Sequence, residues 1–343
     1  MAAIVECVPN FSEGQDASVI ERIAASIASC GCKVMHCDMG YDTNRTVITF
    51  AADKDAVFCG AFAAVKCASQ LIDMRTHKGA HPRIGATDVL PLVPVSGISL
   101  KECAALARAL AEKIFLELGI PCYLYGEAAL QPGRSNLAVC REGEYEALEA
   151  KTLDPALRPD FSERIFTAQA ARSGAINVGA RDFLVAVNFN LDTDDVAVAK
   201  SIAMDVRAKG RPAKDASGRP LTGSDGKPQM FPGLLPGCKA IGWYIKEYGF
   251  AQVSMNITDI SLTPLHTAYE TVCRQAQLRG VRVTGTEIIG LVPARVLTDA
   301  GRHFAGPGSC LGERELMDLA ADTMGLGTIK PYDVSRRVIE YLL

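Results

Sequence analysis

The order of apolar and polar positions predicts that the chain folds into two lobes, each built from both strands and helices. In the first lobe, apolar residues recur every three or four positions over residues 16–29, as expected for an amphipathic helix. Residues 73–88 fit no regular pattern. The elements predicted for this lobe are a strand ending at Pro9, a helix at 16–29, strands at 33–40 and 45–52, a helix at 54–72, a strand at 88–95, a helix at 99–118 and a strand at 121–129.

The second lobe repeats this alternation of strands and helices. A strand at 183–191 is followed by Asp192, which is a good N-cap for a helix running to about Lys209. The elements expected after it are a Gly- and Pro-rich loop at 210–237, a hairpin at 240–257, a helix opened by Thr263 and Pro264 and ended by Gly280, and a strand at 281–292. The resulting order, β-α-β-β-α-β, is the split βαβ of a ferredoxin-like unit.

These patterns predict an α+β protein with two α/β-sandwich subdomains. The second is expected to be ferredoxin-like. The first is expected to be a related unit with insertions, because it begins in the same order before its irregular segment. A glycine-bearing stretch near 174–182 leads into a fresh strand and is expected to hold the boundary. The predicted domains are residues 1–180 and 181–330, followed by a C-terminal tail at 331–343.

Composition narrows the class of function without identifying it. The chain has 343 residues, 48% of them hydrophobic and 22% charged, which suits two lobes with substantial cores. A net charge of −3 gives no global attraction to nucleic acid or to an anionic membrane. No stretch approaches the length of a membrane span, and because Glu6 interrupts the first apolar run we expect no signal peptide. The twelve cysteines form no CxxC pair, so we expect reduced thiols and a cytoplasmic protein.

The irregular segment concentrates residues that can carry chemistry. Its charged and imidazole side chains are Asp73, Arg75, His77, Lys78, His81, Arg83 and Asp88. His77 and His81 are four residues apart, as in a zinc pair on a helix, but Gly79 and Pro82 argue against a helix, and we expect no metal. The segment could be a basic surface loop. Two buried elements flank it, however, and its glycines let the backbone approach a ligand closely, which favours an anion-binding site.

Other candidates carry weaker signals. Asn10, in NFSEG, follows a strand and could offer its side chain to a ligand, or it could belong to the turn that begins a helix. Asp38 lies at the end of a strand, where active-site carboxylates often occur, or it could cap the turn before Tyr41. The run GPGSC at 306–310 lacks the lysine and the strand-to-helix context of a P-loop, so we assign it no phosphate-binding role.

Several of these segments make the chain resemble the glutamate formimidoyltransferases, also called glutamate formiminotransferases. The matching segments are VECVPNFSEG (5–14), DMGYDTNRTVITF (38–50), DMRTHKGAHPRIGATDV (73–89), YLYGEAA (123–129), REGEYEAL (141–148) and AIGWYIKEYGFAQVSMN (240–256). They continue to the final RRVIEYLL, so the resemblance covers the whole chain. Ala80 is a departure, because family members often carry Glu immediately before the catalytic histidine. The folate loop also differs in detail.

The resemblance implies transfer of the formimidoyl group from N-formimidoyl-L-glutamate to N5 of tetrahydrofolate, which releases glutamate in histidine degradation. It implies two α/β subdomains with folate between them, and it places the catalytic histidine at His81. The folate loop falls at about 162–174, with Ser162, Phe166, Ser173 and Gly174 as candidate contacts. Tetrahydrofolate is then a co-substrate, and no cofactor is permanently bound. A cytoplasmic homodimer that passes its product to a separate cyclodeaminase is expected.

The expected chemistry suits a histidine. The imidazole of His81 can exchange protons in either direction near neutrality, because its ordinary pKa is about 6.5. Asp38 is a candidate for orienting His81 or for holding the amidinium of the donor. Both substrates carry carboxylates, so Arg75, Lys78 and Arg83 are candidate partners for them.

Three alternatives stay open at this point. The donor could be N-formylglutamate, which would give 5-formyltetrahydrofolate through the same site. The chain could bind or channel folate without turnover. A metal hydrolase built on His77 and His81 is a third possibility, and a chelator would inactivate it.

Overall fold

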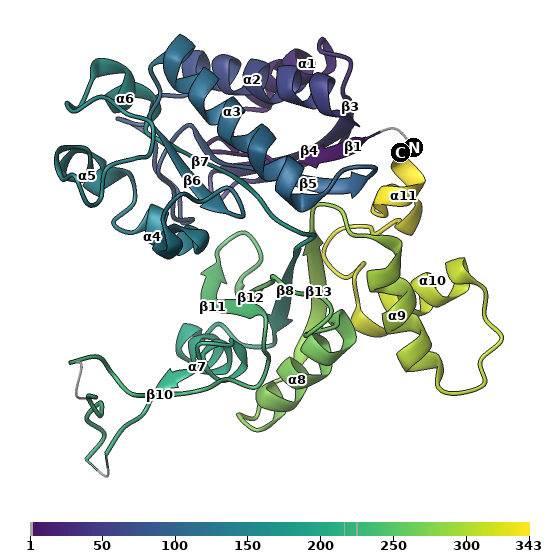
Figure 1. Ribbon diagram of the computed structural model, residues 1–343. Helices are drawn as coiled ribbons and strands as arrows, with labels where there is room; N and C mark the ends of the chain where they lie inside the picture. Colours follow the sequence, from purple (N-terminus) through teal and green to yellow (C-terminus); the bar gives the residue numbers. More distant parts are fainter. Residues whose placement is uncertain (1–2, 216, 224–225) are drawn as a thin grey trace. The chain divides into compact units, whose positions relative to one another are not determined.

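The computed structural model describes residues 3–215, 217–223 and 226–343, which form two compact units, Met1–Asp182 and Phe183–Leu343 (Figure 1). The first unit contains β1 (Ile4–Cys7), β2 (Asn10–Phe11), α1 (Ala17–Ala28), β3 (Lys33–Gly40), β4 (Arg45–Asp53), α2 (Lys54–Leu71), β5 (Thr87–Ser96), α3 (Leu100–Leu118), β6 (Cys122–Gly126), η1 (Pro132–Ser135), α4 (Leu137–Arg141), η2 (Tyr145–Ala147), α5 (Leu148–Leu153), α6 (Ala168–Ser173) and β7 (Ile176–Ala180). The second contains β8 (Val185–Leu191), α7 (Val196–Val206), β9 (Arg211–Pro212), β10 (Met230–Phe231), β11 (Cys238–Ile245), β12 (Phe250–Ile257), α8 (Leu265–Gln277), β13 (Val283–Ile289), α9 (Ala294–Ala305), α10 (Glu313–Met324), η3 (Val334–Arg336) and α11 (Ile339–Leu342). The α+β class is confirmed.

The sheet of the first unit begins as a split βαβ and is then extended. Strands β3, β4, β1 and β5 lie side by side in that order, and neighbouring strands are antiparallel. The short β2 continues the course of β1 and also pairs with β4 and β5. Strand β7 then pairs with β5, and β6 pairs with β7, both in parallel. The first unit therefore begins in the β-α-β-β-α order expected from the sequence and carries an added parallel edge.

Helices α1, α2 and α3 cover one face of this sheet (Figure 1). Their apolar positions pack with Phe50 and Leu92 of the strands in the main core. Helix α3 is fixed locally at both ends. Ser99 and Glu102 form a capping box at its start, and Gly119 ends it in the left-handed conformation at φ +65°. A smaller cluster around Tyr123, on the other face of the sheet, packs against residues of α4 and α5.

The second unit has the element order β8-α7-β11-β12-α8-β13, interrupted after α7 by the small β9–β10 hairpin. Its four main strands are ordered β11-β12-β8-β13, all antiparallel to their neighbours. This arrangement is compatible with the ferredoxin-like unit expected from the sequence. Helices α7 and α8 pack on the sheet, and α9 and α10 pack against each other (Figure 1). No helix among the described residues is long and apolar enough to cross a membrane.

Two expectations about local structure were wrong, and one strand was not expected. The stretch near 174–182 contains β7, which pairs with strands on both sides, and the two units divide after Asp182. Asp192 does not cap α7. Its carboxylate accepts a hydrogen bond from the backbone N–H of Arg282, while Asp195 accepts one from Ala197 and begins the helix. The loop at 210–237 contains β9 and β10 as a hairpin.

The segment expected as a C-terminal tail packs within the second unit. Val334 and Val338 belong to the core of this unit, and each is 2% exposed or less. Val338 also forms a parallel bridge to Val292, directly after β13. Residues 331–343 therefore contribute to the fold of this unit.

Candidate functional site

The loop that carries His81 connects α2 to β5, and backbone contacts fix its tip. The side-chain amide of Asn44 donates to the carbonyl of Lys78 at 2.7 Å, and the N–H of Ala80 donates to the carbonyl of Asp42 at 3.2 Å. Gly79 lies so close to the β3–β4 turn that a Cβ there would overlap the carbonyl oxygen of Thr43. A glycine at this position lets the loop dock on the turn.

Two glycines fix the far end of the same loop. Gly85 and Gly174 form a backbone bridge, and a Cβ on either would overlap a carbonyl oxygen across it. Gly174 also has φ +69°, a conformation that favours glycine. The N–H of Ala86 donates to the carbonyl of Ser173 at 2.8 Å. The structure therefore brings Ser173 and Gly174, two candidate folate contacts, against the loop that bears His81.

The imidazole of His81 is partly buried and oriented by its own backbone neighbour. Nδ1 lies 2.7 Å from the carbonyl oxygen of Pro82. A carbonyl oxygen only accepts hydrogen bonds, so Nδ1 carries the proton and Nε2 is the basic nitrogen. Burial lowers the pKa of His81 to about 3, with Arg45 and Arg141 acting in the same direction and Asp88 against it. The ring is therefore neutral at pH 7 and able to accept a proton.

Arg45, Asp88 and Arg141, which we call the arginine–aspartate cluster, form the charged surroundings of His81. Nη1 of Arg45 and Nη2 of Arg141 each lie 2.6 Å from Oδ2 of Asp88, which is fully buried. Oδ1 of Asp88 accepts the N–H of Ile84 at 3.0 Å. Burial opposes ionisation of Asp88, but Arg141 and Arg45 outweigh it and hold the pKa of its carboxyl below the usual value. The carboxylate thus joins the start of β5 to β4 and α4.

Asn10 belongs to the same group. Its side-chain oxygen accepts a hydrogen bond from Nη2 of Arg45 at 3.0 Å, and its amide donates to the carbonyl of Val8 at 2.8 Å. Asp38 is half-buried on the edge strand β3. It is paired with Val47, and the next residue on the same face, Gly40, is paired with Arg45. Asp38 therefore faces the same side of the sheet as Arg45, and its role in catalysis stays a prediction.

Two of the three loop cations are engaged by acids of the chain itself. Arg83 is buried and donates to both carboxylate oxygens of Glu146 at 2.7 Å. It also lies 3.3 Å from a carboxylate oxygen of Glu144, whose φ of +57° is unusual for a residue other than glycine. Arg75 donates to Asp73 at 2.9 and 2.5 Å. These guanidinium groups hold the loop together.

His77 uses both ring nitrogens within the protein. Nε2 lies 3.0 Å from the carbonyl oxygen of Asn44 and therefore donates, while Nδ1 accepts from Nε of Arg83 at 3.4 Å. Burial lowers the pKa of His77. Across the described residues there is no group of three or more His, Cys, Asp or Glu side chains arranged to hold a metal ion. His77 is thus positioned as part of the loop's internal structure.

The remaining candidate folate contacts lie on the segment that leads to α6. Ser162 donates to the carbonyl of Pro159 at 3.3 Å, and Phe166 packs beside the Tyr123 cluster. The hydroxyl of Ser173 accepts from the side chain of Gln169 at 2.9 Å. The apolar cluster against which Phe166 packs also contains Ile84 of the His81 loop.

Arg45 and Arg141 were not singled out from the sequence. Both stand in segments that carry the resemblance, NRTV and REGEYEAL. A further signal was present, because Arg45 is the first residue of β4 and Asp88 the second of β5, and most other residues of both strands are apolar. Charged residues at such positions are buried only when they are paired.

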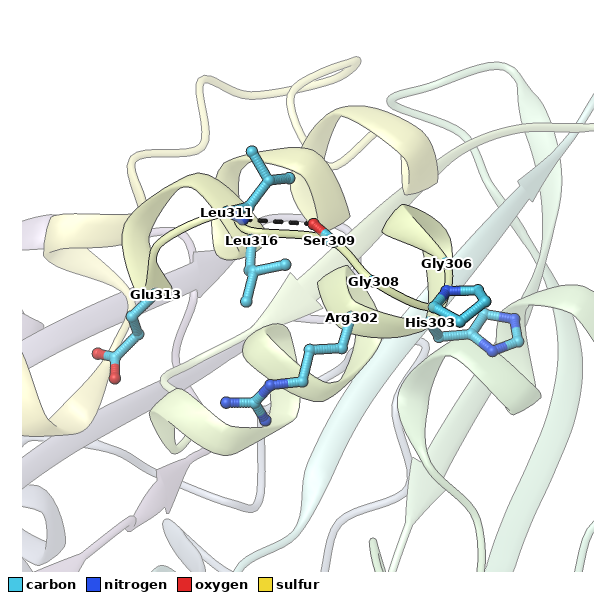
Figure 2. Close-up of a pocket in the computed structure, with 9 residues that line it drawn as sticks. Arg302, His303, Gly306, Gly308, Ser309, Leu311, Glu313 and Leu316 are labelled. Carbon is cyan, nitrogen blue, oxygen red and sulfur yellow. Dashed lines mark hydrogen bonds between the residues drawn. The ribbon is translucent and has the colours of Figure 1, made fainter.

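A separate hollow of about 620 Å³ lies in the second unit, between the end of α9 and the start of α10 (Figure 2). Arg302, His303 and Ser309 contribute polar groups to it. Arg302 is paired with Asp299, and Nε2 of His303 lies 2.8 Å from a carboxylate oxygen of Glu270. The hollow is remote in sequence from the charged residues around His81, and its polar side chains are engaged by the protein, so we place no reaction there.

Comparison with known proteins identifies the family of the chain. Residues 4–181 match the N-terminal subdomain of the formiminotransferase domain, and residues 186–343 match the formiminotransferase domain. The formimidoyltransferase-cyclodeaminase of Rattus norvegicus is 42% identical over 346 residues, which cover 100% of this chain and 60% of the relative. The glutamate formimidoyltransferases of Thermoplasma acidophilum and Streptococcus pyogenes serotype M1 are each 39% identical over 305 residues, covering 88% and 89% of this chain and 92% and 94% of the relatives. This chain spans about 60% of the length of the bifunctional relatives, and it belongs to the formiminotransferase family.

Proposed function

We propose that the protein transfers the formimidoyl group from N-formimidoyl-L-glutamate to N5 of tetrahydrofolate, giving 5-formimidoyltetrahydrofolate and L-glutamate. The names of the two microbial relatives support this reaction. The observation that carries it is the state of His81, whose Nδ1 is held by Pro82 while Nε2 is left basic beside the arginine–aspartate cluster. Tetrahydrofolate is a co-substrate in this proposal and leaves with the product.

The reaction requires two proton movements and no covalent enzyme intermediate. N5 attacks the formimidoyl carbon and forms a C–N bond, which gives a tetrahedral carbon bearing three nitrogens. N5 loses its proton, and the nitrogen of glutamate gains one as its bond to carbon breaks. His81 accepts the first proton at Nε2 and delivers a proton to the departing amine, so it ends the cycle neutral. General acid–base catalysis of this kind is typically worth about 10²–10⁴-fold.

The other residues act by binding and orientation. Asp38, on the same side of the sheet as Arg45, is proposed to hold the amidinium of the donor. Ser162, Phe166, Ser173 and Gly174 are proposed to contact folate, because two of them lie against the His81 loop. Lys78, which is exposed at the loop tip, is proposed to attract a substrate carboxylate. Holding both reactants in line contributes to the rate in addition to proton transfer.

A coupled spectrophotometric assay with both substrates tests the proposal. Wild-type protein should turn over, and His81→Ala should lower kcat/KM by about 10²–10⁴-fold. His303→Ala is the matched control, because His303 lies in the second unit and is paired with Glu270. A His81→Ala variant that keeps most of its kcat/KM would contradict the acid–base role.

The same assay separates the alternatives. Faster turnover of N-formyl-L-glutamate than of the formimidoyl donor would identify a formyltransferase. Folate binding without product from well-folded wild-type protein would identify a binding protein. A homodimer, a cytoplasmic location and a separate cyclodeaminase for the product stay predictions that belong to this proposal.

A further inference from the structure

The arginine–aspartate cluster carries more positive than negative charge. Arg45 and Arg141 share a single carboxylate oxygen, Oδ2 of Asp88. The side chains of Asp88 and Arg45 are only 0% and 8% exposed. Guanidinium groups stay protonated at ordinary pH, and His81 is neutral, so these four side chains together have a charge of +1. A buried charge without compensation is costly, and an anionic ligand would remove that cost.

Arg141 indicates where such a ligand would be held. Its side chain is 17% exposed, so it is more accessible than Arg45. Its Nη2 donates to Asp88, whereas its Nε is buried and has no hydrogen-bond partner among the described residues. Guanidinium groups are suited to binding carboxylates through more than one N–H. Arg75 and Arg83, in contrast, are already paired with Asp73 and Glu146, respectively.

We propose that Arg141, supported by Arg45, binds the α-carboxylate of the formimidoyl donor beside His81, an inference that rests on the proposed function. The chemistry of the donor identifies which carboxylate this is. The nitrogen that leaves is bonded to Cα, and Cα carries the α-carboxylate. That group is therefore always one carbon away from the nitrogen that His81 protonates. The side-chain carboxylate is two bonds farther from that nitrogen, and the carboxylates of folate are farther still from the reacting atoms.

Occupation of this site has a consequence for His81. In the protein without bound donor, burial, Arg45 and Arg141 lower the pKa of His81 to about 3. Asp88 and the carbonyl of Pro82 act in the opposite direction. An imidazole with so low a pKa is a weak base near neutral pH. A carboxylate on Arg141 cancels the excess positive charge and raises the pKa of His81 towards its ordinary value. The donor thereby activates the histidine that acts on it.

Binding experiments without tetrahydrofolate test this inference, because nothing can react. The probe is N-formyl-L-glutamate, in which oxygen replaces the NH of the donor. The matched probe is N-formyl-4-aminobutyrate, which lacks the α-carboxylate. Calorimetry gives each Kd, and NMR of the imidazole signals gives the pKa of His81, assigned by their loss in His81→Gln. We expect N-formyl-L-glutamate to bind more tightly and to raise the pKa of His81, and N-formyl-4-aminobutyrate to leave it low.

Variants separate the site from general effects of charge. Arg141→Met should weaken binding of N-formyl-L-glutamate about 10- to 100-fold, as expected for loss of a charged hydrogen bond. Arg22→Met, which removes a cation from the exposed side of α1, should leave binding unchanged. If Arg141→Met does not fold, Arg141→Lys serves instead. Arg141→Lys keeps the positive charge but lacks the several N–H groups of a guanidinium. Binding of N-formyl-L-glutamate should therefore weaken, while the pKa of His81 stays low in the protein without ligand.

The outcomes distinguish this inference from the proposed function. Equal affinity for the two probes, or tight binding of N-formyl-L-glutamate that leaves the pKa of His81 unchanged, overturns the carboxylate site. The expected binding response together with no turnover of N-formimidoyl-L-glutamate supports the carboxylate site and overturns the proposed reaction alone.

Discussion

In both units a helix leads into the last strand of a four-stranded antiparallel arrangement, but the connection differs greatly between them. In the second unit, α8 reaches β13 through residues 278–282. This turn of five residues contains Gly280, which has a positive φ of +73°. In the first unit, α2 reaches β5 through residues 72–86, fifteen residues that contain His81 and its supports. The shared order of strands and helices provides a stable frame in each unit. The candidate catalytic residue, His81, lies on one enlarged connection of that frame.

The enlarged connection is held by buried charges, whereas the short one is held by an exposed ion pair. Asp88 lies just after the long connection and pairs with both Arg45 and Arg141, and its own side chain has no exposure to solvent. At the end of the short connection, Arg282 is paired with Asp192 and its side chain is 83% exposed. Buried pairs cost far more to break than exposed ones, because the remaining charge stays uncompensated. The two connections should therefore respond very differently to the same kind of substitution.

The largest expected effect is that of Asp88→Asn. Removing this charge leaves two guanidinium groups together without a carboxylate, and we expect a loss of about 3–5 kcal/mol in the free energy of unfolding. Asp192→Asn, the matched change in the second unit, should cost less than about 1 kcal/mol. Urea unfolding of both variants beside the wild type measures the difference. Equal losses would show that the long connection does not depend on its buried charges.

A smaller effect is expected at the glycines. Gly174 and Gly280 have positive φ values of +69° and +73°, so alanine carries a backbone penalty at both. The ψ of −151° at Gly174 adds to that penalty, because few residues other than glycine adopt this combination. A Cβ at Gly174 also overlaps the carbonyl oxygen of Ile84, whereas Gly280 has open space around it. Gly174→Ala should therefore cost about 2–4 kcal/mol and lower kcat/KM, because the loop that carries His81 moves.

Gly280→Ala is the matched control for that substitution. It should cost about 1–2 kcal/mol, the backbone penalty alone, and should leave kcat/KM unchanged. Thermal unfolding and the coupled assay measure both properties. If the two alanine variants behave alike, the close approach between Gly174 and the His81 loop is not needed to hold the loop in place.

The sequence predicts those elements whose ends are set by neighbouring residues, and it misses those that depend on distant contacts. Helix α3 was predictable because Ser99, Glu102 and Gly119 mark its ends through neighbouring residues. Strand β7 was missed because five buried residues give no period of their own, and its position depends on pairing with β5 and β6. Helices α9 and α10 were missed because neither begins with a side-chain cap of the Ser, Thr, Asp or Asn type.

The candidate site likewise contains residues that the sequence reveals and residues that it does not. His81 stood out because its loop concentrates charge and glycine within a few residues of sequence. Arg45 and Arg141 did not, because they reach Asp88 from 43 and 53 residues away. Pairing over such separations is decided by strand register and helix packing, which spacing in the sequence does not reveal. The same limit explains why Arg83 was proposed as a substrate contact although the fold pairs it with Glu146.

The smallest expected effect is a change of the free energy of unfolding with pH. Within the long connection, it reports on His81 alone. Its pKa is about 3 in the folded protein and about 6.5 in an unfolded chain. As pH falls below 6.5, the unfolded state takes up a proton that the folded state does not, so stability falls, and the loss continues towards pH 3. His81→Gln removes this contribution. We therefore expect the wild type to lose more free energy of unfolding than His81→Gln between pH 7 and pH 5, as measured by urea unfolding at both values. Equal losses would show that burial and the two arginines do not hold the imidazole neutral. The long connection would then lack the electrostatic property that distinguishes it from the short one.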